Sequence, residues 1–193
     1  MQEYYVWHEM LLFTRFLQYA TDQSRIVQQY VKPYDFMRQY APSETVVLEV
    51  GGGLIHGCLY SLLMNAWSPK KIIYADLQLL HAEFIGWLLE SKKVPHEIRY
   101  SEAPHSPQLV GCEPVNIAFA KDVFEHVADP EILLSQLYDV LRPGGMFAVD
   151  LTDKKAGYQH LSPKLHHLTD LIANCRKVEQ FGELSVYQKP STK

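Results

Sequence analysis

The sequence predicts one α/β domain with a doubly wound, mainly parallel sheet, a helical N-terminal part and a C-terminal antiparallel hairpin. Short β-branched segments alternate with helical segments from residue 45 onward, and this alternation is typical of right-handed βαβ units. The chain has 193 residues, of which 47% are hydrophobic, so it can bury one full core. Near the C-terminus, Gly182-Glu183 separates two strand-like segments and is typical of a hairpin turn.

The expected strands are short apolar runs bounded by glycine, proline or charged residues. They cover residues 45–50, 71–75, 97–100, 115–120, 146–151, 177–181 and 184–188. The expected helices cover residues 3–20, 21–31, 59–67, 79–91, 129–141 and 166–175, with a further short turn over 34–40. Because helices join the parallel strands, we expect both faces of the sheet to be covered.

Both ends of the expected helix over residues 129–141 carry sequence signals. Asp129 is expected to accept hydrogen bonds from the free N–H groups of the first turn, and Pro130 suits that turn because it has no N–H to satisfy. The segment Arg142-Pro143-Gly144-Gly145 is expected to break the helix before the next strand begins.

Composition and charge argue against several classes of protein. The net charge is −4, so no basic face for nucleic acid is expected. Cys58, Cys112 and Cys175 are widely spaced, as expected of free thiols in a reducing compartment. Charged residues interrupt the N-terminal segment, and no long apolar run follows. We therefore expect neither a signal peptide nor a membrane span, and a cytoplasmic protein.

Glycines and an acid stand where an open α/β sheet binds nucleosides. Ligands bind beyond the carboxyl ends of the strands, where Gly51, Gly52 and Gly53 follow the first expected strand and Asp76 follows the second. The glycines allow a sharp turn and a close ligand approach, and a carboxylate can accept hydrogen bonds from both ribose hydroxyls. The alternatives are a purely structural turn and a helix N-cap. The pair alone does not distinguish a dinucleotide from S-adenosylmethionine.

A longer motif narrows this choice. The segments Asp122-Val123-Phe124-Glu125-His126-Val127-Ala128-Asp129-Pro130 and Leu141-Arg142-Pro143-Gly144-Gly145 resemble the signature of class I S-adenosylmethionine-dependent methyltransferases, closest to the group that acts on small molecules. The resemblance covers about residues 46–151. It implies a seven-stranded sheet, an N-terminal helical cap over residues 1–42 on a Rossmann-like core over 43–193, and methyl transfer from S-adenosylmethionine to a small-molecule acceptor by in-line displacement.

The resemblance also implies which residues bind the cofactor. Glu49 and the turn 51–53 match the motif that lies along the methionine part. Asp76 matches the acid that binds the ribose, and Leu77 matches the residue that packs on the adenine. The remaining matches are Glu102 and Ala103 at the adenine edge, and Ala120, Lys121 and Asp122 beside the methionine and its methyl group.

Two positions depart from the family pattern. Ile55 stands where a third glycine is usual, and Gly57 comes two residues later. The loop therefore carries an insertion, or Ile55 narrows the site. Asn116 replaces the usual aspartate of the fourth strand, a position we interpret as structural.

Candidates for chemistry beyond cofactor binding are few. His126 follows the fourth expected strand, so it is the candidate general base, although a structural role under the cofactor is the preferred interpretation. The candidate acceptor-binding residues are Tyr5 and His8 in the first helix, and Tyr158 after the fifth strand. No metal site is predicted, because no acid or cysteine accompanies His160, His166 and His167 at ligand spacing.

Two other functions share parts of this pattern. A nicotinamide-dependent oxidoreductase has the same strand, glycine turn and acid, but the third glycine and a second substrate domain are missing here. A methyltransferase-like binding or scaffold protein without catalysis is the second alternative, which Ile55 and the short chain leave open. The aromatic N-terminal helix is a candidate surface for forming an oligomer.

Overall fold

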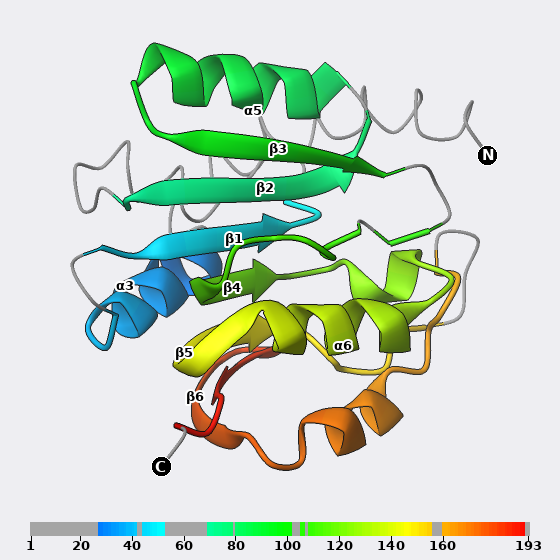
Figure 1. Cartoon of the computed structure of the whole chain (residues 1–193). Helices are drawn as coiled ribbons and strands as arrows, with labels where there is room; N and C mark the ends of the chain where they lie inside the picture. Colours follow the sequence, from blue (N-terminus) through cyan, green and yellow to red (C-terminus); the bar gives the residue numbers. More distant parts are fainter. Residues whose placement is uncertain are drawn as a thin grey trace.

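The computed structural model describes residues 27–41, 44–52, 69–78, 80–101, 105–106, 108–155 and 160–191. Within these ranges seven strands form one sheet in the order β3-β2-β1-β4-β5-β7-β6 (Figure 1). The expected helices over 3–20 and 59–67 lie outside the described residues. None of the helices in the described part has the length and apolar character needed to cross a membrane.

The sheet is parallel except at its C-terminal end. The strands are β1 (Val46–Val50), β2 (Lys71–Leu77), β3 (His96–Ser101), β4 (Val115–Ala120), β5 (Leu141–Val149), β6 (Arg176–Phe181) and β7 (Leu184–Gln188). Strands β1 to β5 pair in parallel, while β7 pairs antiparallel with both β5 and β6. The predicted doubly wound fold with a terminal hairpin is therefore confirmed.

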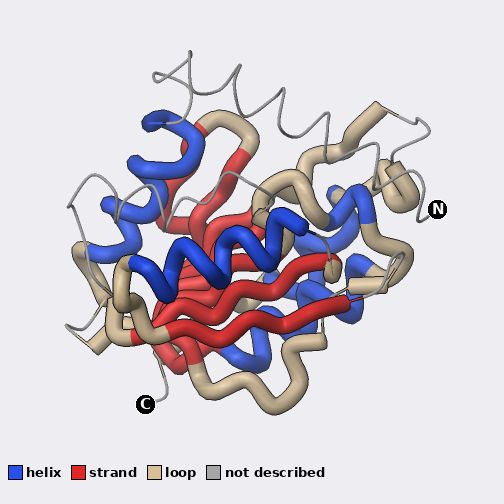
Figure 2. The backbone as a smooth tube through the Cα atoms, turned by 90° about the horizontal axis from the view of Figure 1, so that it is seen from above, coloured by secondary structure: helices blue, strands red, loops and turns tan. Residues whose placement is uncertain are grey.

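Helices cover both faces of this sheet, with α6 in front of it and α3 behind it in Figure 1 and the same layers seen from above in Figure 2. They are the π-helical turn η1 (Val27–Val31), α3 (Lys32–Arg38), α5 (Leu80–Ser91), the 3₁₀ turn η2 (Phe124–His126), α6 (Pro130–Val140) and the 3₁₀ helix η3 (His166–Ile172). One apolar core lies under α6 and η3 and the other under η1, α3 and α5. Each face of the sheet therefore has its own hydrophobic core.

The central strands are buried along their whole length, as expected of parallel strands covered on both faces. Every residue of β1 and β4 is buried, including Asn116 near the start of β4. The Asn116 Oδ1 accepts a hydrogen bond from the Val46 N–H at 2.9 Å. This polar side chain joins two neighbouring strands, which supports the structural interpretation of that position.

Helix α6 ends at Val140, in agreement with the predicted break at residues 142–145, but β5 begins earlier than expected, at Leu141, because this segment already belongs to the strand. Leu141 pairs with Val115 and Met146 pairs with Ile117, so the extra residues of β5 form an irregularity in the ladder. Gly144 adopts a φ of +76°, and its N–H points to the carbonyls of Lys189 and Pro190, at 3.2 and 3.3 Å. The chain after β7 thus bonds to this irregular part of β5.

Two helix predictions also need correction. Asp129 does not cap α6 with its side chain, because its Oδ1 accepts from the Ser106 N–H at 3.0 Å and so ties the loop before β4 to the helix start. Pro130 does occupy the first turn of α6, as expected. The segment after His166 forms a 3₁₀ helix that ends at Ile172, earlier than the expected end of the helix.

The described cysteines agree with the sequence prediction. Cys112 and Cys175 are free thiols of intermediate exposure, and burial raises the pKa of both. Cys58 lies outside the described residues.

Candidate cofactor and acceptor site

The order of the strands reverses between β1 and β4. From β1 the sheet continues through β2 and β3 on one side and through β4 and β5 on the other. Val50 pairs with both Ala75 and Ala120, so the residues that follow these three lie together at one edge of the sheet (Figure 1). Open α/β sheets bind their ligands at such a switch point.

Gly51 turns the chain out of β1 and is bonded to the neighbouring strand β2. Its φ of +61° lies in the left-handed region, which favours glycine. Its N–H donates to the Ala75 carbonyl at 2.8 Å. A Cβ at this position would lie 2.6 Å from the Val123 Cγ2, in the segment after β4. Gly51 therefore fills the structural role of a tight turn, and the turn lies directly beside Asp76.

Asp76 is the penultimate residue of β2, and its buried carboxylate contacts Tyr74, Leu77 and His81. Its Oδ1 accepts from the Leu77 N–H at 2.7 Å, and its Oδ2 accepts from the Tyr74 hydroxyl. The His81 Nε2, at the start of α5, lies 3.3 Å from the same Oδ2. Because α5 begins at Leu80, Asp76 is not the N-cap residue of that helix.

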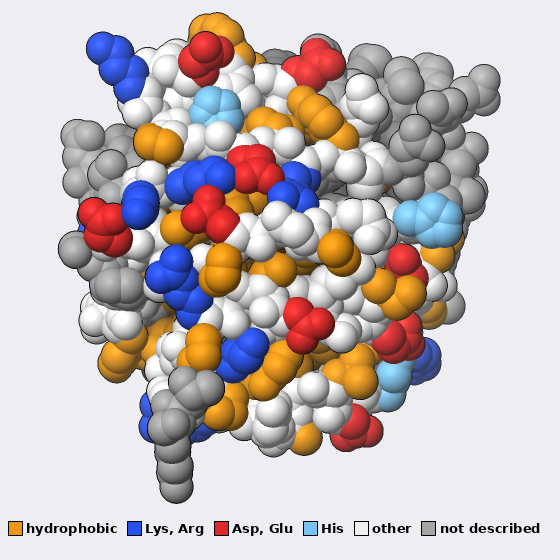
Figure 3. All heavy atoms as spheres, in the orientation of Figure 1, with side chains coloured by type: hydrophobic (Ala, Val, Ile, Leu, Met, Phe, Trp, Pro, Cys, Tyr) orange, Lys and Arg blue, Asp and Glu red, His pale blue; other side chains and the backbone are white. Residues whose placement is uncertain are grey.

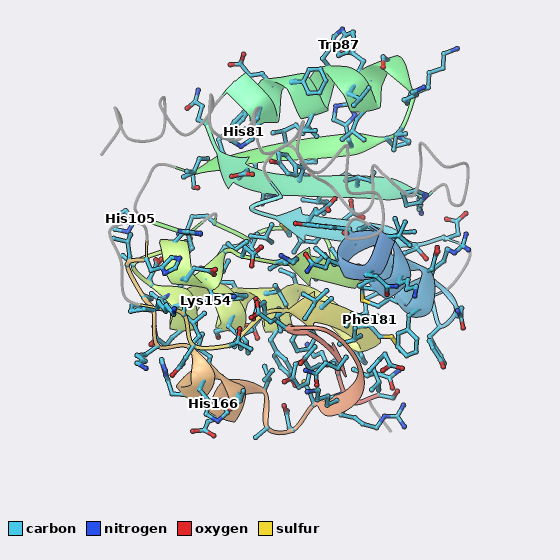
Figure 4. All side chains as sticks on the ribbon, turned by 180° about the vertical axis from the view of Figure 1, so that it is seen from behind. His81, Trp87, His105, Lys154, His166 and Phe181 are labelled. Carbon is cyan, nitrogen blue, oxygen red and sulfur yellow. The ribbon has the colours of Figure 1, made fainter. Side chains whose placement is uncertain are left out.

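These contacts keep Asp76 ionised. Burial alone would raise the pKa of this carboxyl, but the interactions with His81, Tyr74 and the Leu77 N–H outweigh it and hold the pKa below its usual value. An ionised carboxylate is an acceptor only, which suits a pair of hydroxyl donors. The sequence analysis did not predict His81 as a site residue. The one sequence feature that could have indicated it is its position near the start of the helix after β2 (Figure 4).

The other cofactor candidates described on β1, β2 and β4 lie near the same edge. Glu49 is buried within β1, opposite Tyr74 on one side and Phe119 on the other. Leu77 ends β2 and is half-buried, and Ala120 ends β4 and is fully buried. The structure thus brings together the predicted residues from three strands.

Lys121 and Asp122 follow β4 as an ion pair. The Lys121 Nζ contacts the Asp122 carboxylate and lies 5.4 Å from the centre of the Tyr30 ring, which links η1 to the site. Asp122 has a φ of +53°, and 42% of its side chain is exposed. Burial would raise the pKa of Asp122, but the charges of Lys121, Lys154 and His126 outweigh it and lower that pKa. Asp122 therefore presents a negative charge at this edge.

His126, the candidate base, lies in η2 beside Glu125 and His160. The rings of His126 and His160 are 5.4 Å apart between their centres. Glu125 is buried, and this burial raises the pKa of its carboxyl. The His160 Nδ1 lies 2.7 Å from the Lys155 carbonyl.

The three histidines that are close in sequence are not one cluster. His166 and His167 are exposed on η3, and the His167 Nε2 lies 2.9 Å from the Glu131 carboxylate. His160 instead joins His126, which comes from a different loop. Sequence spacing alone gave no signal for this pairing.

Lys154 is a second residue that the sequence did not reveal. Its ammonium lies 2.6 Å from the Asp150 Oδ2, 3.2 Å from the Glu183 Oε2 and 4.0 Å from the Glu125 Oε1. Burial would lower the pKa of Lys154, but the bond to Asp150 and these charges outweigh it and raise that pKa. Both Lys154 and His81 lie toward the side of the sheet where the strands end (Figure 4).

Several predicted site residues lie outside the described residues. They are Gly53 in the glycine turn, Glu102 and Ala103 after β3, Tyr5 and His8 near the N-terminus, and Tyr158 after β5. Ile55 and Gly57, the two departures in the glycine loop, lie outside them as well.

The described fold and site define a class. The sheet is doubly wound and carries a C-terminal antiparallel hairpin, as in Rossmann-like domains. The glycine turn after β1 and the ionised acid near the end of β2 suit a nucleoside ligand.

The chain belongs to the methyltransferase domain family, whose sequence profile matches residues 48–149. It is a class I S-adenosylmethionine-dependent methyltransferase, as the resemblance predicted. No curated protein sequence matches the chain.

Solved structures with the same fold have low sequence identity to the chain. The [4+2]-cyclase SpnF has a TM-score of 0.59 at 12% identity, with 83% of this chain and 81% of that chain covered. A SAM-dependent methyltransferase from Aquifex aeolicus has a TM-score of 0.55 at 18% identity, covering 84% and 90%. The N-methyltransferase NodS from Bradyrhizobium japonicum, bound to S-adenosyl-L-homocysteine, has a TM-score of 0.56 at 15% identity, covering 83% and 87%. These likenesses show the fold, which serves a cyclase as well as methyltransferases.

Proposed function

We propose that this chain transfers the methyl group of S-adenosylmethionine to a small-molecule acceptor by in-line displacement at the carboxyl edge of its sheet. The ionised, buried Asp76 beside the Gly51 turn is the observation that carries this proposal. Family membership supports the reaction class.

The described residues fit the cofactor. The Asp76 carboxylate suits the ribose diol, because charged acceptors make the stronger hydrogen bonds. The turn at Gly51 and Gly52 allows close approach to the methionine part, and the half-buried Leu77 offers an apolar contact for the adenine. Asp122 keeps a negative charge that suits the ammonium of the methionine part. Glu49, Ala120 and Lys121 complete the proposed set.

Positioning is the main task of these residues. Bound S-adenosylmethionine supplies an activated methyl carbon on a positively charged sulfur. The protein then has to hold the acceptor in line with that carbon, and such orientation can account for much of the rate. His126 is the proposed base where the acceptor must lose a proton, because it follows β4 closely and lies among Glu125 and His160.

Charge supports a small acceptor over a nucleic acid. The chain has 18 basic and 22 acidic side chains, and the two signs are interspersed on the face shown in Figure 3. A nucleic-acid partner requires a basic surface to neutralise its phosphates.

Calorimetry with S-adenosylmethionine tests the proposal. We expect Asp76→Asn to weaken binding by about 10- to 100-fold, because a charge-assisted hydrogen bond contributes about 1.5–3 kcal/mol. Tyr74→Phe is the matched control, since it removes a partner of Asp76 but keeps the carboxylate, and a much smaller loss is expected.

Two outcomes would contradict the proposal. An unchanged affinity for S-adenosylmethionine in a folded Asp76→Asn protein would show that Asp76 does not contribute to cofactor binding. Binding of NADH in place of S-adenosylmethionine by the wild-type chain would favour the oxidoreductase alternative.

A further inference from the structure

We propose that Glu125, His126 and His160 form a site for a divalent transition-metal cation, and that the acceptor binds this cation through oxygen. The cation site stands on the geometry of these three residues. The assignment of the acceptor as an oxygen nucleophile rests in addition on the proposed methyl transfer.

The three residues converge from two loops at the carboxyl edge of the sheet. Glu125 and His126 lie in η2 after β4, and His160 lies in the loop after β5. Each offers one ligand atom, and these atoms all lie within 4.8 Å of one another. Ligands about 2.1 Å from one cation are about 3–4 Å apart, so small side-chain shifts are enough to close the site.

His160 is already oriented as a metal ligand. Its Nδ1 lies 2.7 Å from the Lys155 carbonyl. Because a carbonyl only accepts, this nitrogen must carry the proton and donate it. In the neutral form of this tautomer, the Nε2 of His160 carries the lone pair that can bind a cation. Metal-bound histidines are commonly held by such a hydrogen bond to a backbone carbonyl.

Glu125 supplies an acid that lacks a full set of partners. It is 2% exposed, and its Oε2 has no hydrogen-bond partner among the residues that the structure describes. Lys154 lies 4.0 Å from the Oε1, but it is 2.6 Å from Asp150 and 3.2 Å from Glu183. A buried carboxylate with an unsatisfied oxygen is costly, and a bound cation would remove that cost.

The ligand set indicates the kind of cation and its use. Two imidazoles and a carboxylate suit first-row cations such as Zn²⁺ or Fe²⁺, and three protein ligands leave coordination positions open. Asp122 of the proposed cofactor site lies three residues before Glu125, so the cation site is close in sequence to that site.

A cation at this place defines the acceptor chemistry. It would bind a hydroxyl of the acceptor and lower the pKa of that hydroxyl. With the cation bound, His126 is a ligand and no longer the base, so the hydroxyl proton passes to water. The oxygen forms a bond to the methyl carbon while the carbon–sulfur bond breaks, and its electron pair stays on sulfur. The acceptor class is therefore a hydroxyl compound.

Titration of the metal-free full chain with Zn²⁺ in a calorimeter tests the site. We expect one Zn²⁺ per chain, and at least 10-fold weaker binding in Glu125→Gln and in His160→Asn. His166→Asn is the matched control, because His166 is an exposed histidine of η3 outside the cluster, and its affinity should equal that of the wild type. No Zn²⁺ binding by the wild type, or equal binding by all variants, would overturn the proposal.

Two further measurements separate this proposal from the proposed function. Co²⁺ in the site should give a visible absorption band, and acetohydroxamate, a bidentate oxygen ligand, should shift that band. An unshifted band would contradict the proposal that the cation has open coordination positions. The affinity for S-adenosyl-L-homocysteine should stay within about 3-fold in Glu125→Gln. A chain that binds this nucleoside but no Zn²⁺ refutes the cation site alone, whereas one that binds Zn²⁺ but no nucleoside refutes the proposed function and leaves the cation site standing.

Discussion

At Gly51 two separate constraints act on one residue. The backbone adopts a φ of +61°, and the space where a side chain would begin is occupied by Val123. Gly182 meets only the first constraint, because it has a φ of +65° but nothing within 4 Å of its ideal Cβ position. The pair therefore allows the conformational and the steric costs to be measured separately.

Replacing Gly51 by alanine should destabilise the chain more than the same change at Gly182. We expect Gly182→Ala to cost about 1–2 kcal/mol, the cost of a left-handed non-glycine residue. Gly51→Ala should cost about 1–3 kcal/mol more, because its Cβ would press on Val123. Urea unfolding measures both changes, and Val123→Ala in the Gly51→Ala background should recover part of the difference. Equal losses at the two glycines would show that the contact with Val123 is harmless.

Asp76 makes the stability of the chain depend on pH in a defined direction. Its pKa in the folded chain lies below the value of 3.8 expected for the unfolded chain. Its contribution is therefore fully present above pH 3.8 and is lost as the pH falls through the folded pKa. We expect the difference in unfolding free energy between wild type and Asp76→Asn to shrink as the pH falls below 3.8. Urea unfolding at each pH measures it, and a difference that grows on acidification would contradict the assigned direction.

At the scale of the elements, buried apolar runs were the most predictable features. The expected strand over residues 115–120 matches β4, because a run that is apolar except for Asn116 suits a covered parallel strand. The predicted start of β5 was wrong by several residues, because the segment around Gly144 bonds to the backbone after β7 and belongs to the strand. Asp129 shows the same limit, since its partner Ser106 comes from another loop. Each of these two wrong predictions resulted from a contact between residues that are distant in sequence.

Asn116 provides a test of how β1 and β4 are joined. Asn116→Ala removes the acceptor of the Val46 N–H, and leaving a buried donor unpaired costs about 1–3 kcal/mol. Asn116→Asp keeps an acceptor oxygen and is expected to lose clearly less. Thermal unfolding of the two variants against wild type measures the effect. An Asn116→Ala protein as stable as the wild type would mean that this side chain does not support the strand pairing.

At the scale of the whole molecule, the predictable part of the site is the part that strand ends determine. Gly51 and Asp76 were predicted because each lies where a strand ends, and the ends of adjacent parallel strands share one edge. His81, His160 and Lys154 were not, because their partners come from other segments whose approach depends on the completed fold. Local pattern therefore identifies the turn and the acid at the strand ends, and tertiary packing brings in the residues from other segments.

Lys154 links the end of β5 to the turn of the terminal hairpin. Its ammonium lies between the fully buried Asp150 and Glu183, which is 69% exposed. Because the pKa of Lys154 is raised, its stabilising contribution is fully present below the unfolded value of 10.5 and is lost only at higher pH. At neutral pH the lysine therefore compensates a buried carboxylate.

Removing this cation should destabilise the whole fold at neutral pH. We expect Lys154→Met to cost about 3–5 kcal/mol, because Asp150 is left buried without its counter-ion. Glu183→Gln is the control, since an exposed ion pair contributes about 0–1 kcal/mol. Urea unfolding at pH 7 measures both variants. If Lys154→Met loses no more than Glu183→Gln, the Asp150 carboxylate does not depend on this lysine, and the hairpin is attached to the sheet by strand pairing and apolar contacts alone.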